Sequence, residues 1–106
     1  MHSDGYIVDI LDDLAEIGVN AINAQLDCMD VFELGERFSG KISFWGGFGR
    51  QYFLPFGSET EVRAEVRKIA DGLLAKRRTG VIGGCNIDKD ARPENITAMY
   101  DEWRKV

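Results

Sequence analysis

The sequence has little cysteine, no long apolar run and no basic stripe. Its two cysteines among 106 residues, Cys28 and Cys85, exclude a disulfide framework as the organising device of the fold. No stretch approaches the roughly 20 apolar residues of a membrane span. The polar start at His2, Ser3 and Asp4 is not that of a signal peptide. We therefore expect a cytoplasmic protein with no membrane partner.

Acidic residues outnumber basic ones in this chain. The net charge is −5, and the basic residues are spread along the sequence apart from Lys76, Arg77 and Arg78. Such a distribution offers no stripe that could neutralise a phosphate backbone, so nucleic acid is not an expected partner. The short basic run is expected at the C-terminus of a helix, where cations interact favourably with the helix dipole.

The remaining composition is that of an ordinary globular protein. Apolar residues make up 44% of the chain and charged residues 29%, which is far from the composition of disordered segments. A chain of this length forms one domain at most, and it buries about two thirds of the surface of its unfolded state. We therefore expect a single domain over residues 1–106.

The spacing of apolar residues predicts helices that alternate with strands. The expected helices cover residues 6–17, 30–38, 58–76 and a segment that begins at Pro93. The expected strands between them cover residues 19–24, 42–45 and 81–82. Alternation of this kind predicts an α/β fold with a parallel sheet of three main strands.

Capping signals mark the ends of several of these elements. Asp30 and Ser58 are each followed by a glutamate three residues later, the spacing of a capping box. Gly18 is expected in the left-handed conformation that ends a helix. The Leu54-Pro55-Phe56-Gly57 segment is expected to lie in a long loop. The last helix should carry its apolar residues on one face, namely Ile96, Met99, Tyr100 and Trp103.

Several sequence blocks, taken in order, resemble those of one family. The blocks are Met1-His2-Ser3-Asp4-Gly5, residues 17–23, Cys28-Met29-Asp30, Phe44-Trp45-Gly46-Gly47 with Leu54-Pro55-Phe56-Gly57, and Pro93-Glu94-Asn95-Ile96. Together they span essentially the whole chain and resemble the uroporphyrinogen decarboxylase superfamily, whose fold is a (β/α)8 barrel. The resemblance implies the C-terminal portion of that barrel. The expected fold is therefore a partial (β/α)8 TIM barrel, with the end of strand 5, strands 6 to 8 and helices 5 to 8.

The resemblance implies two kinds of chemistry, and the chain departs from the residue pattern of both. Family decarboxylases remove carboxylates from the acetate side chains of a porphyrinogen without a cofactor. They use arginine and aspartate groups contributed largely by the N-terminal half of the barrel, and they place a histidine where Cys85 stands. We therefore expect this chain to be inactive alone as a decarboxylase. The alternative is a fragment of a zinc-dependent, corrinoid-linked methyltransferase, which belongs to the second branch of the superfamily.

The resemblance places His2, Asp4 and Cys85 at the positions of the methyltransferase zinc ligands. Imidazole, carboxylate and thiolate all bind zinc, although Asp4 stands where that branch has a cysteine and is a harder ligand than thiolate. The competing interpretation is that Asp4 caps the first helix and Cys85 is a small apolar residue at a strand end. Zinc is thus the candidate cofactor, and no cofactor is certain.

Polar and aromatic residues near the predicted strand ends indicate a ligand pocket. Gln25, Trp45, Gln51 and Asn86 occupy such positions, and barrels place their sites at the carboxyl ends of their strands. In a full barrel this pocket could accept a tetrapyrrole or corrinoid-related ligand. The glycines from Gly46 to Gly49 are expected to form a tight strand exit, because they lack the spacing of a dinucleotide fingerprint.

Three parallel strands alone would leave two sheet edges and one apolar face uncovered. The uncovered face is expected to carry Ile22, Phe44 and Ile82 or their alternating neighbours. Burial of such a face is worth about 25 cal/mol per Å2, and two-fold dimers are the commonest oligomers. We therefore expect a homodimer or a higher homo-oligomer. A self-assembling structural or interaction module is accordingly a further interpretation of the function.

Overall fold

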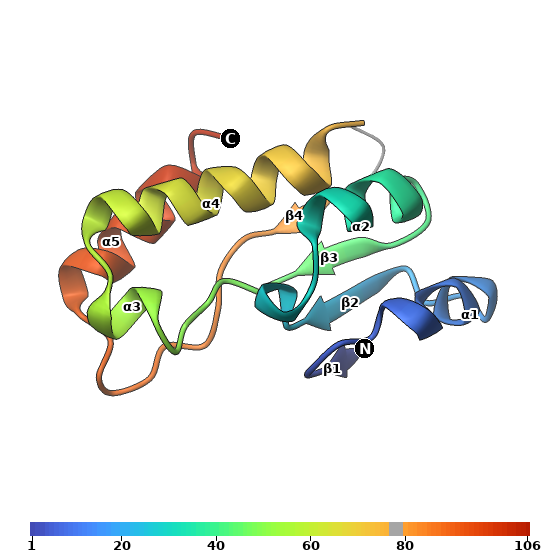
Figure 1. Cartoon of the computed structure of the whole chain (residues 1–106), viewed down its shortest axis with the longest axis horizontal. Helices are drawn as coiled ribbons and strands as arrows, with labels where there is room; N and C mark the ends of the chain where they lie inside the picture. Colours follow the sequence, from blue (N-terminus) through green and yellow to red (C-terminus); the bar gives the residue numbers. More distant parts are fainter. Residues whose placement is uncertain (77–79) are drawn as a thin grey trace.

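A computed structural model of the chain describes residues 1–76 and 80–106, so Arg77 and Arg78 of the basic run lie outside the described residues. The centre of the described part is a parallel sheet (Figure 1). Its strands are β1 (His2–Ser3), β2 (Ala21–Ala24), β3 (Ser43–Trp45) and β4 (Val81–Ile82). They lie side by side in chain order, and every neighbouring pair is parallel. The α/β class and the partial TIM-barrel arrangement predicted from the sequence are confirmed.

The sheet has one strand more than the three main strands predicted. The additional strand, β1, is only two residues long and pairs His2 with Asn23 and Ser3 with Ala24. So short a strand carries no period-two pattern of its own, and only the resemblance of its sequence block placed it at the end of a barrel strand.

Helices follow the strands as the sequence predicted. They are α1 (Leu11–Glu16), preceded by a 3-10 turn (Val8–Ile10), α2 (Val31–Phe38), α4 (Glu59–Leu74) and α5 (Pro93–Trp103), and a further 3-10 turn covers Leu26–Cys28. No helix within residues 1–76 or 80–106 combines the length and apolar character needed to cross a membrane.

The expectation of a long loop around Leu54–Gly57 is wrong in part, because Phe53–Phe56 forms the short helix α3. The Asn95 side chain of α5 donates to the carbonyl oxygens of Phe53, Leu54 and Gly57 at 3.1, 3.1 and 2.8 Å. The partner that stabilises this turn is therefore about 40 residues away in sequence. No local pattern could have revealed it.

The predicted capping signals are present. Ser58 and Glu61 form a reciprocal capping box, in which the Ser58 N–H donates to Glu61 Oε2 at 2.8 Å and the Glu61 N–H donates to Ser58 Oγ at 3.2 Å. Asp30 accepts from the Phe32 and Glu33 N–H groups, but Glu33 pairs with Arg37 at 2.6 Å instead of completing a second box. Gly18 has the left-handed φ of 95° expected at a helix end.

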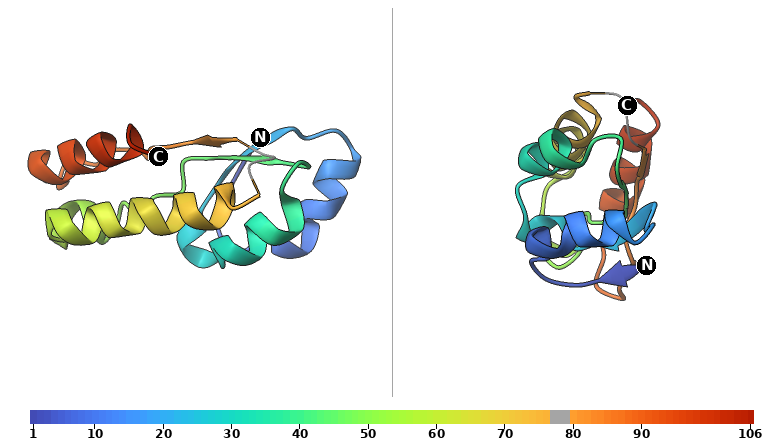
Figure 2. Two further views of the ribbon diagram at one scale, coloured as in Figure 1. Left: turned by 90° about the horizontal axis from the view of Figure 1, so that it is seen from above. Right: turned by 90° about the vertical axis from the view of Figure 1, so that its right-hand side faces the viewer.

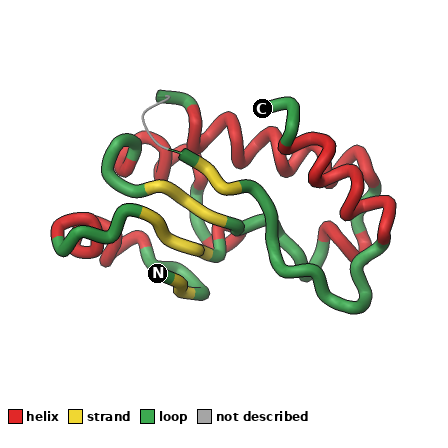
Figure 3. The backbone as a smooth tube through the Cα atoms, turned by 180° about the vertical axis from the view of Figure 1, so that it is seen from behind, coloured by secondary structure: helices red, strands yellow, loops and turns green. Residues whose placement is uncertain are grey.

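The helices leave one face of the sheet open. In Figure 2, α2 and α4 lie on one side of the strands, and in Figure 3, seen from behind, the strands lie in front of the helices with nothing over them. Ile22 and Phe44 point toward the helices and are fully buried. The strand registers place Asn23, Trp45 and Ile82 on the opposite face. The prediction left open either Ile22 and Phe44 or their alternating neighbours, and the neighbours Asn23 and Trp45 are the ones that lie beside Ile82 on the open face.

The α5 helix packs through most of the predicted face, because Met99 is buried and Ile96 and Trp103 lie against the core, but it also buries polar residues that the prediction did not include. Asn95, Ala98, Met99 and Glu102 are buried, whereas Tyr100 is 40% exposed. The reason is polar packing against α4, since the Glu102 carboxylate contacts Arg63 at 3.3 Å and also pairs with Arg67. Apolar spacing alone cannot locate a helix face that is partly buried by ion pairs.

Candidate functional site

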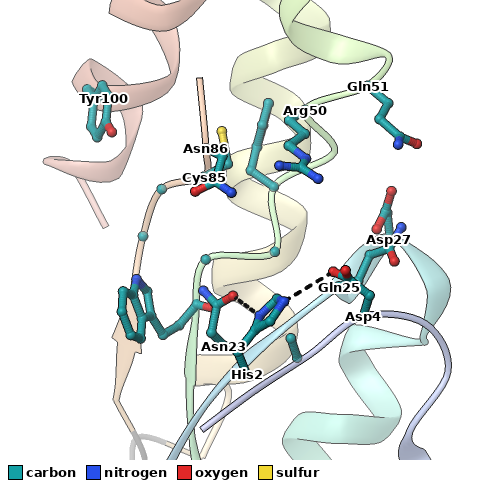
Figure 4. A pocket seen from close by; sticks show the side chains of 17 residues that line it. His2, Asp4, Asn23, Gln25, Asp27, Arg50, Gln51, Cys85, Asn86 and Tyr100 are labelled. Atoms are coloured by element: carbon teal, nitrogen blue, oxygen red, sulfur yellow. Dashed lines mark hydrogen bonds and ion pairs between the residues drawn. The ribbon is translucent and has the colours of Figure 1, made fainter. Parts of the chain in front are cut away.

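A pocket of about 470 Å3 lies beyond the carboxyl ends of the strands (Figure 4). The four residues predicted to form a ligand pocket, Gln25, Trp45, Gln51 and Asn86, all line it. Three further residues predicted from the sequence, His2, Asp4 and Cys85, line it as well. The end of a parallel sheet thus gathers side chains that are up to 84 positions apart, because the strands point in one direction.

Glycines shape the pocket floor where the chain leaves β3. Gly46 and Gly47 have φ values of 77° and 81°, which side chains other than glycine rarely adopt. A Cβ atom on Gly47 would lie 2.2 Å from the Cγ atom of Leu26. The glycine segment is therefore a tight strand exit, as predicted, and it keeps the backbone close to the neighbouring loop.

A chain of contacts orients His2 at one side of the pocket (Figure 4). The Asn23 amide nitrogen donates to the Trp45 carbonyl at 3.1 Å, which directs Asn23 Oδ1 toward His2 Nδ1 at 2.5 Å. Because Oδ1 can only accept a hydrogen bond, His2 carries a proton on Nδ1. Its Nε2 atom lies 3.6 Å from Asp4 Oδ1. Nε2 is thus the ring nitrogen that faces the Asp4 carboxylate.

Gln25 connects the pocket wall to the end of β1. Its Oε1 atom accepts from the Gly5 N–H at 3.0 Å. The amide nitrogen of Gln25 has no hydrogen-bond partner within the described part of the chain. It is therefore available to donate to a ligand acceptor in the pocket.

The pocket is mixed in charge. Arg50 lines it, with its Nε atom 4.0 Å from Asp88 Oδ2, and Asp4 and Asp27 line it too. Among the described lining residues, two carboxylates thus stand against one guanidinium. The pocket can accept hydrogen-bonding groups of both kinds, but it does not by itself carry an excess of positive charge.

The Cys85 thiol is half-buried in the pocket wall, with its Sγ atom 3.8 Å from the Met99 Sδ atom. Burial raises the pKa of this thiol to about 11. The group is therefore protonated near neutral pH, whereas a metal ligand must be a thiolate.

The three proposed zinc ligands are not brought together. Within residues 1–76 and 80–106, no group of three or more His, Cys, Asp or Glu side chains could hold a metal ion. His2 and Asp4 contact each other, and Cys85 lies on another part of the wall. The residues present do not fit a three-ligand zinc site. Asp4 is not a helix cap either, because the 3-10 turn that follows has no side-chain cap.

Sequence reasoning missed Asn23, Asp27, Arg50 and Tyr100, which also line the pocket. A signal existed for Asn23, because it follows the buried Ile22 in a strand and so belongs to the opposite face. Arg50 lies in a loop and Asp27 in the short 3-10 turn Leu26–Cys28, and in neither does a period assign a direction to the side chain. Tyr100 lines the pocket because α5 buries Ala98, Met99 and Glu102, which leaves the Tyr100 hydroxyl beside Gly84.

Comparison with protein-family models gives a match to "Uroporphyrinogen decarboxylase (URO-D)", and the match covers residues 1–106. Among curated proteins no match was found.

Proposed function

Because this chain belongs to the uroporphyrinogen decarboxylase family, we propose that it forms one wall of a tetrapyrrole-binding site and is inactive alone as a decarboxylase. The observation that carries the proposal is the pocket at the carboxyl ends of the strands. In it, His2 from β1, Asn23 from β2 and Arg50 from the segment after β3 converge. This is the end of the sheet at which barrels bind their ligands.

The lining offers suitable partners for the carboxylates and pyrrole nitrogens of such a ligand. Arg50 can form charge-assisted hydrogen bonds with a carboxylate, and the Gln25 amide nitrogen can donate as well. The Trp45 ring can contact an apolar macrocycle. Asp4 or Asp27 can accept hydrogen bonds from pyrrole N–H groups.

The same lining explains why we propose no activity for the chain by itself. A porphyrinogen with acetate side chains is polyanionic, and one guanidinium against two carboxylates does not neutralise it. The family resemblance assigns further arginine and aspartate groups to the N-terminal half of the barrel. In this proposal the chain corresponds to the C-terminal portion of a family barrel, and strands outside these four supply those groups.

The methyltransferase alternative receives no support from the pocket geometry, since Cys85 lies apart from His2 and Asp4. A cytoplasmic location, expected from the sequence, remains part of the proposal.

The activity test incubates uroporphyrinogen with the purified chain and follows the loss of carboxyl groups by mass spectrometry. We expect the rate seen in buffer alone. Turnover by the pure chain would refute the proposed inactivity.

The binding test uses the two tryptophans as matched reporters. Trp45 is one of the residues that line the pocket, whereas Trp103 is not and packs against Gly83, a glycine of the pocket wall. In the Trp103→Phe variant, where Trp45 is the remaining tryptophan, uroporphyrinogen is expected to quench fluorescence saturably. In the Trp45→Phe variant we expect only the linear decrease caused by ligand absorption. Equal, linear responses in both variants would contradict binding at this wall.

A further inference from the structure

Asn23 occupies the centre of a hydrogen-bonded row that crosses the open face of the sheet from β1 to β3. In the strand registers its neighbours are His2 on β1 and Trp45 on β3. The Asn23 Nδ2 atom donates to the Trp45 carbonyl at 3.1 Å, and Asn23 Oδ1 lies 2.5 Å from His2 Nδ1. One side-chain amide therefore joins the imidazole ring of His2 to the backbone of β3.

The amide of Asn23 can adopt only one orientation in this row. A backbone carbonyl oxygen only accepts hydrogen bonds, so the amide nitrogen must face Trp45 and the amide oxygen must face His2. The amide is also confined sterically, because a Cβ atom on Gly46 would lie 2.8 Å from Asn23 Nδ2. Gly46 has a φ of 77°, which side chains other than glycine rarely adopt. The glycine that follows β3 thus leaves the space that the amide occupies.

This orientation determines which nitrogen of His2 carries the proton in the neutral ring. Because Asn23 Oδ1 accepts, the proton is on Nδ1, and Nε2 carries a lone pair. Nε2 lies 3.6 Å from Asp4 Oδ1. Two hydrogen-bond acceptors therefore face each other, and neither can donate to the other. With the proton on Nε2 instead, His2 could donate to Asp4, and the two groups would satisfy each other without a ligand.

The two facing acceptors are accessible from the pocket. The side chains of His2 and Asp4 line it and are 60% and 72% exposed. Figure 4 shows the contacts that connect Asn23, His2 and Asp4 along one side of the pocket. Among the described residues, no group donates a hydrogen bond to His2 Nε2 or to the Asp4 carboxylate. A ligand N–H group placed between them would satisfy both acceptors at once.

We propose that Asn23 is a positioning residue that holds His2 in the Nδ1–H tautomer, so that Nε2 and the Asp4 carboxylate form a joint acceptor site for an N–H donor of the ligand. The inference rests on the proposed function for the identity of that donor, which is a pyrrole N–H group of a porphyrinogen. The action of Asn23 on His2 does not depend on a ligand, because the tautomer is measurable in the free chain.

The first measurement is a long-range proton–nitrogen NMR spectrum of the nitrogen-labelled chain at about pH 9, where imidazole rings are neutral. His2 is the only histidine in the sequence, so the imidazole signals need no residue assignment. In the wild type we expect a protonated Nδ1 and an unprotonated Nε2. In Asn23→Leu, whose side chain is of similar size but cannot accept, we expect the proton on Nε2, from which it can be donated to Asp4.

Two variants control for indirect effects on the ring. Asn23→Asp retains an oxygen acceptor for Nδ1 and should keep the wild-type tautomer. Asn86→Leu removes another asparagine that lines the pocket but has no hydrogen bond to His2, and it should keep that tautomer too. A wild-type chain with the proton on Nε2 would overturn the proposal whatever the variants show. An Asn23→Leu chain that keeps the proton on Nδ1 would overturn it as well.

The second measurement is equilibrium dialysis of uroporphyrinogen, without oxygen, against the wild type and its variants. The Kd should rise about threefold to tenfold in Asn23→Leu, as expected for the loss of a hydrogen bond between neutral groups. His2→Phe removes Nε2 and should weaken binding by a similar factor. Adding Asn23→Leu to His2→Phe should cause no further loss, because Asn23 acts through His2.

These outcomes separate the inference from the function on which it rests. A wild-type chain that does not bind uroporphyrinogen would overturn both the proposed function and the joint acceptor site. Binding by the wild type that Asn23→Leu leaves unchanged would overturn this inference alone. A further loss of affinity in the double variant would likewise mean that Asn23 contributes by another route than His2.

Discussion

The half-buried Cys85 thiol should react slowly. Since burial raises its pKa to about 11, the reactive thiolate is scarce at neutral pH, and the alkylation rate should rise about tenfold per pH unit below that value. We predict that iodoacetamide modifies the exposed Cys28 well before Cys85 at neutral pH. Mass spectrometry of the single-thiol variants Cys28→Ser and Cys85→Ser measures the two rates separately. Equal rates at neutral pH would contradict the prediction.

Glu102 is a buried carboxylate whose ionised form is stabilised by the fold. A hydrogen bond from Lys105 and another from Arg63, with the charge of Arg67, hold the pKa of Glu102 below its usual value, against the effect of burial. Because the folded-state pKa is lowered, the stabilisation is fully present above the unfolded-state pKa of about 4.3 and is lost as the pH falls through the lower folded-state value.

We therefore predict that Glu102→Gln lowers the free energy of unfolding at neutral pH, and that its difference from wild type shrinks as the pH falls below about 4.3. Urea unfolding across the acidic range measures both. Glu94→Gln, an exposed carboxylate of the same helix, serves as the control and should show little difference at any pH. A gap between Glu102→Gln and wild type that is constant with pH would argue against this role.

Single residues were predictable where their partners are close in sequence. Ser58 and Glu61 are three positions apart, so a capping box could be read directly. The Glu102 contact with Arg63 spans 39 positions, and the approach of Asn95 to the α3 carbonyls spans about as many. Contacts of this separation depend on the tertiary arrangement, which residue spacing does not encode.

At the scale of elements, the close approach of α2 and α4 depends on two glycines. A Cβ atom on Gly35 would lie 1.9 Å from the Gly72 carbonyl oxygen, and one on Gly72 would lie 2.9 Å from Val31 backbone atoms. The obstructing atoms belong to helix backbones, so they can move away only if the helices separate.

We predict that Gly35→Ala destabilises the fold by about 2 kcal/mol, since overpacking costs about 1–3 kcal/mol and exceeds the gain in helix propensity of up to about 1 kcal/mol. Thermal unfolding should show a Tm lower by several degrees. Gly80→Ala is the matched control, because among the described residues its added Cβ meets only Ser43 Oγ at an ordinary 3.5 Å. A Gly35→Ala protein as stable as wild type would show that the helices can separate without loss.

Element order was predictable because each strand is bounded by glycine or polar residues and each long helix has a clear period. The direction in which strand side chains point was not predictable. Ile22 and Asn23 lie on opposite faces of the sheet, and the sequence of a strand does not indicate which face the helices cover. Position in the sequence identified Gln25, Trp45, Gln51 and Asn86, whereas Asn23, Asp27 and Arg50 required the three-dimensional arrangement.

At the scale of the whole molecule, the uncovered sheet face links stability to association. If copies of the chain associate through this face, as the sequence leads us to expect, unfolding includes dissociation, and mass action raises the stability of the folded state with protein concentration. A tenfold increase in concentration contributes about 1.4 kcal/mol. For a unit of roughly twice this chain length, each kcal/mol raises Tm by about 2–4 °C.

We therefore predict that the wild-type Tm rises by roughly 3–5 °C for each tenfold increase in concentration. In the control Phe32→Lys, the changed side chain is exposed on α2, on the other side of the molecule from the open sheet face. Its Tm should rise with concentration as much as that of the wild type. Ile82→Lys places a charge on the open face, so this variant should unfold at a lower temperature that does not depend on concentration, because a second copy can no longer bury Trp45 and residue 82. Differential scanning calorimetry over two decades of concentration measures these slopes. A wild-type Tm that is constant over that range would mean that the isolated chain is stable with its sheet face exposed to water.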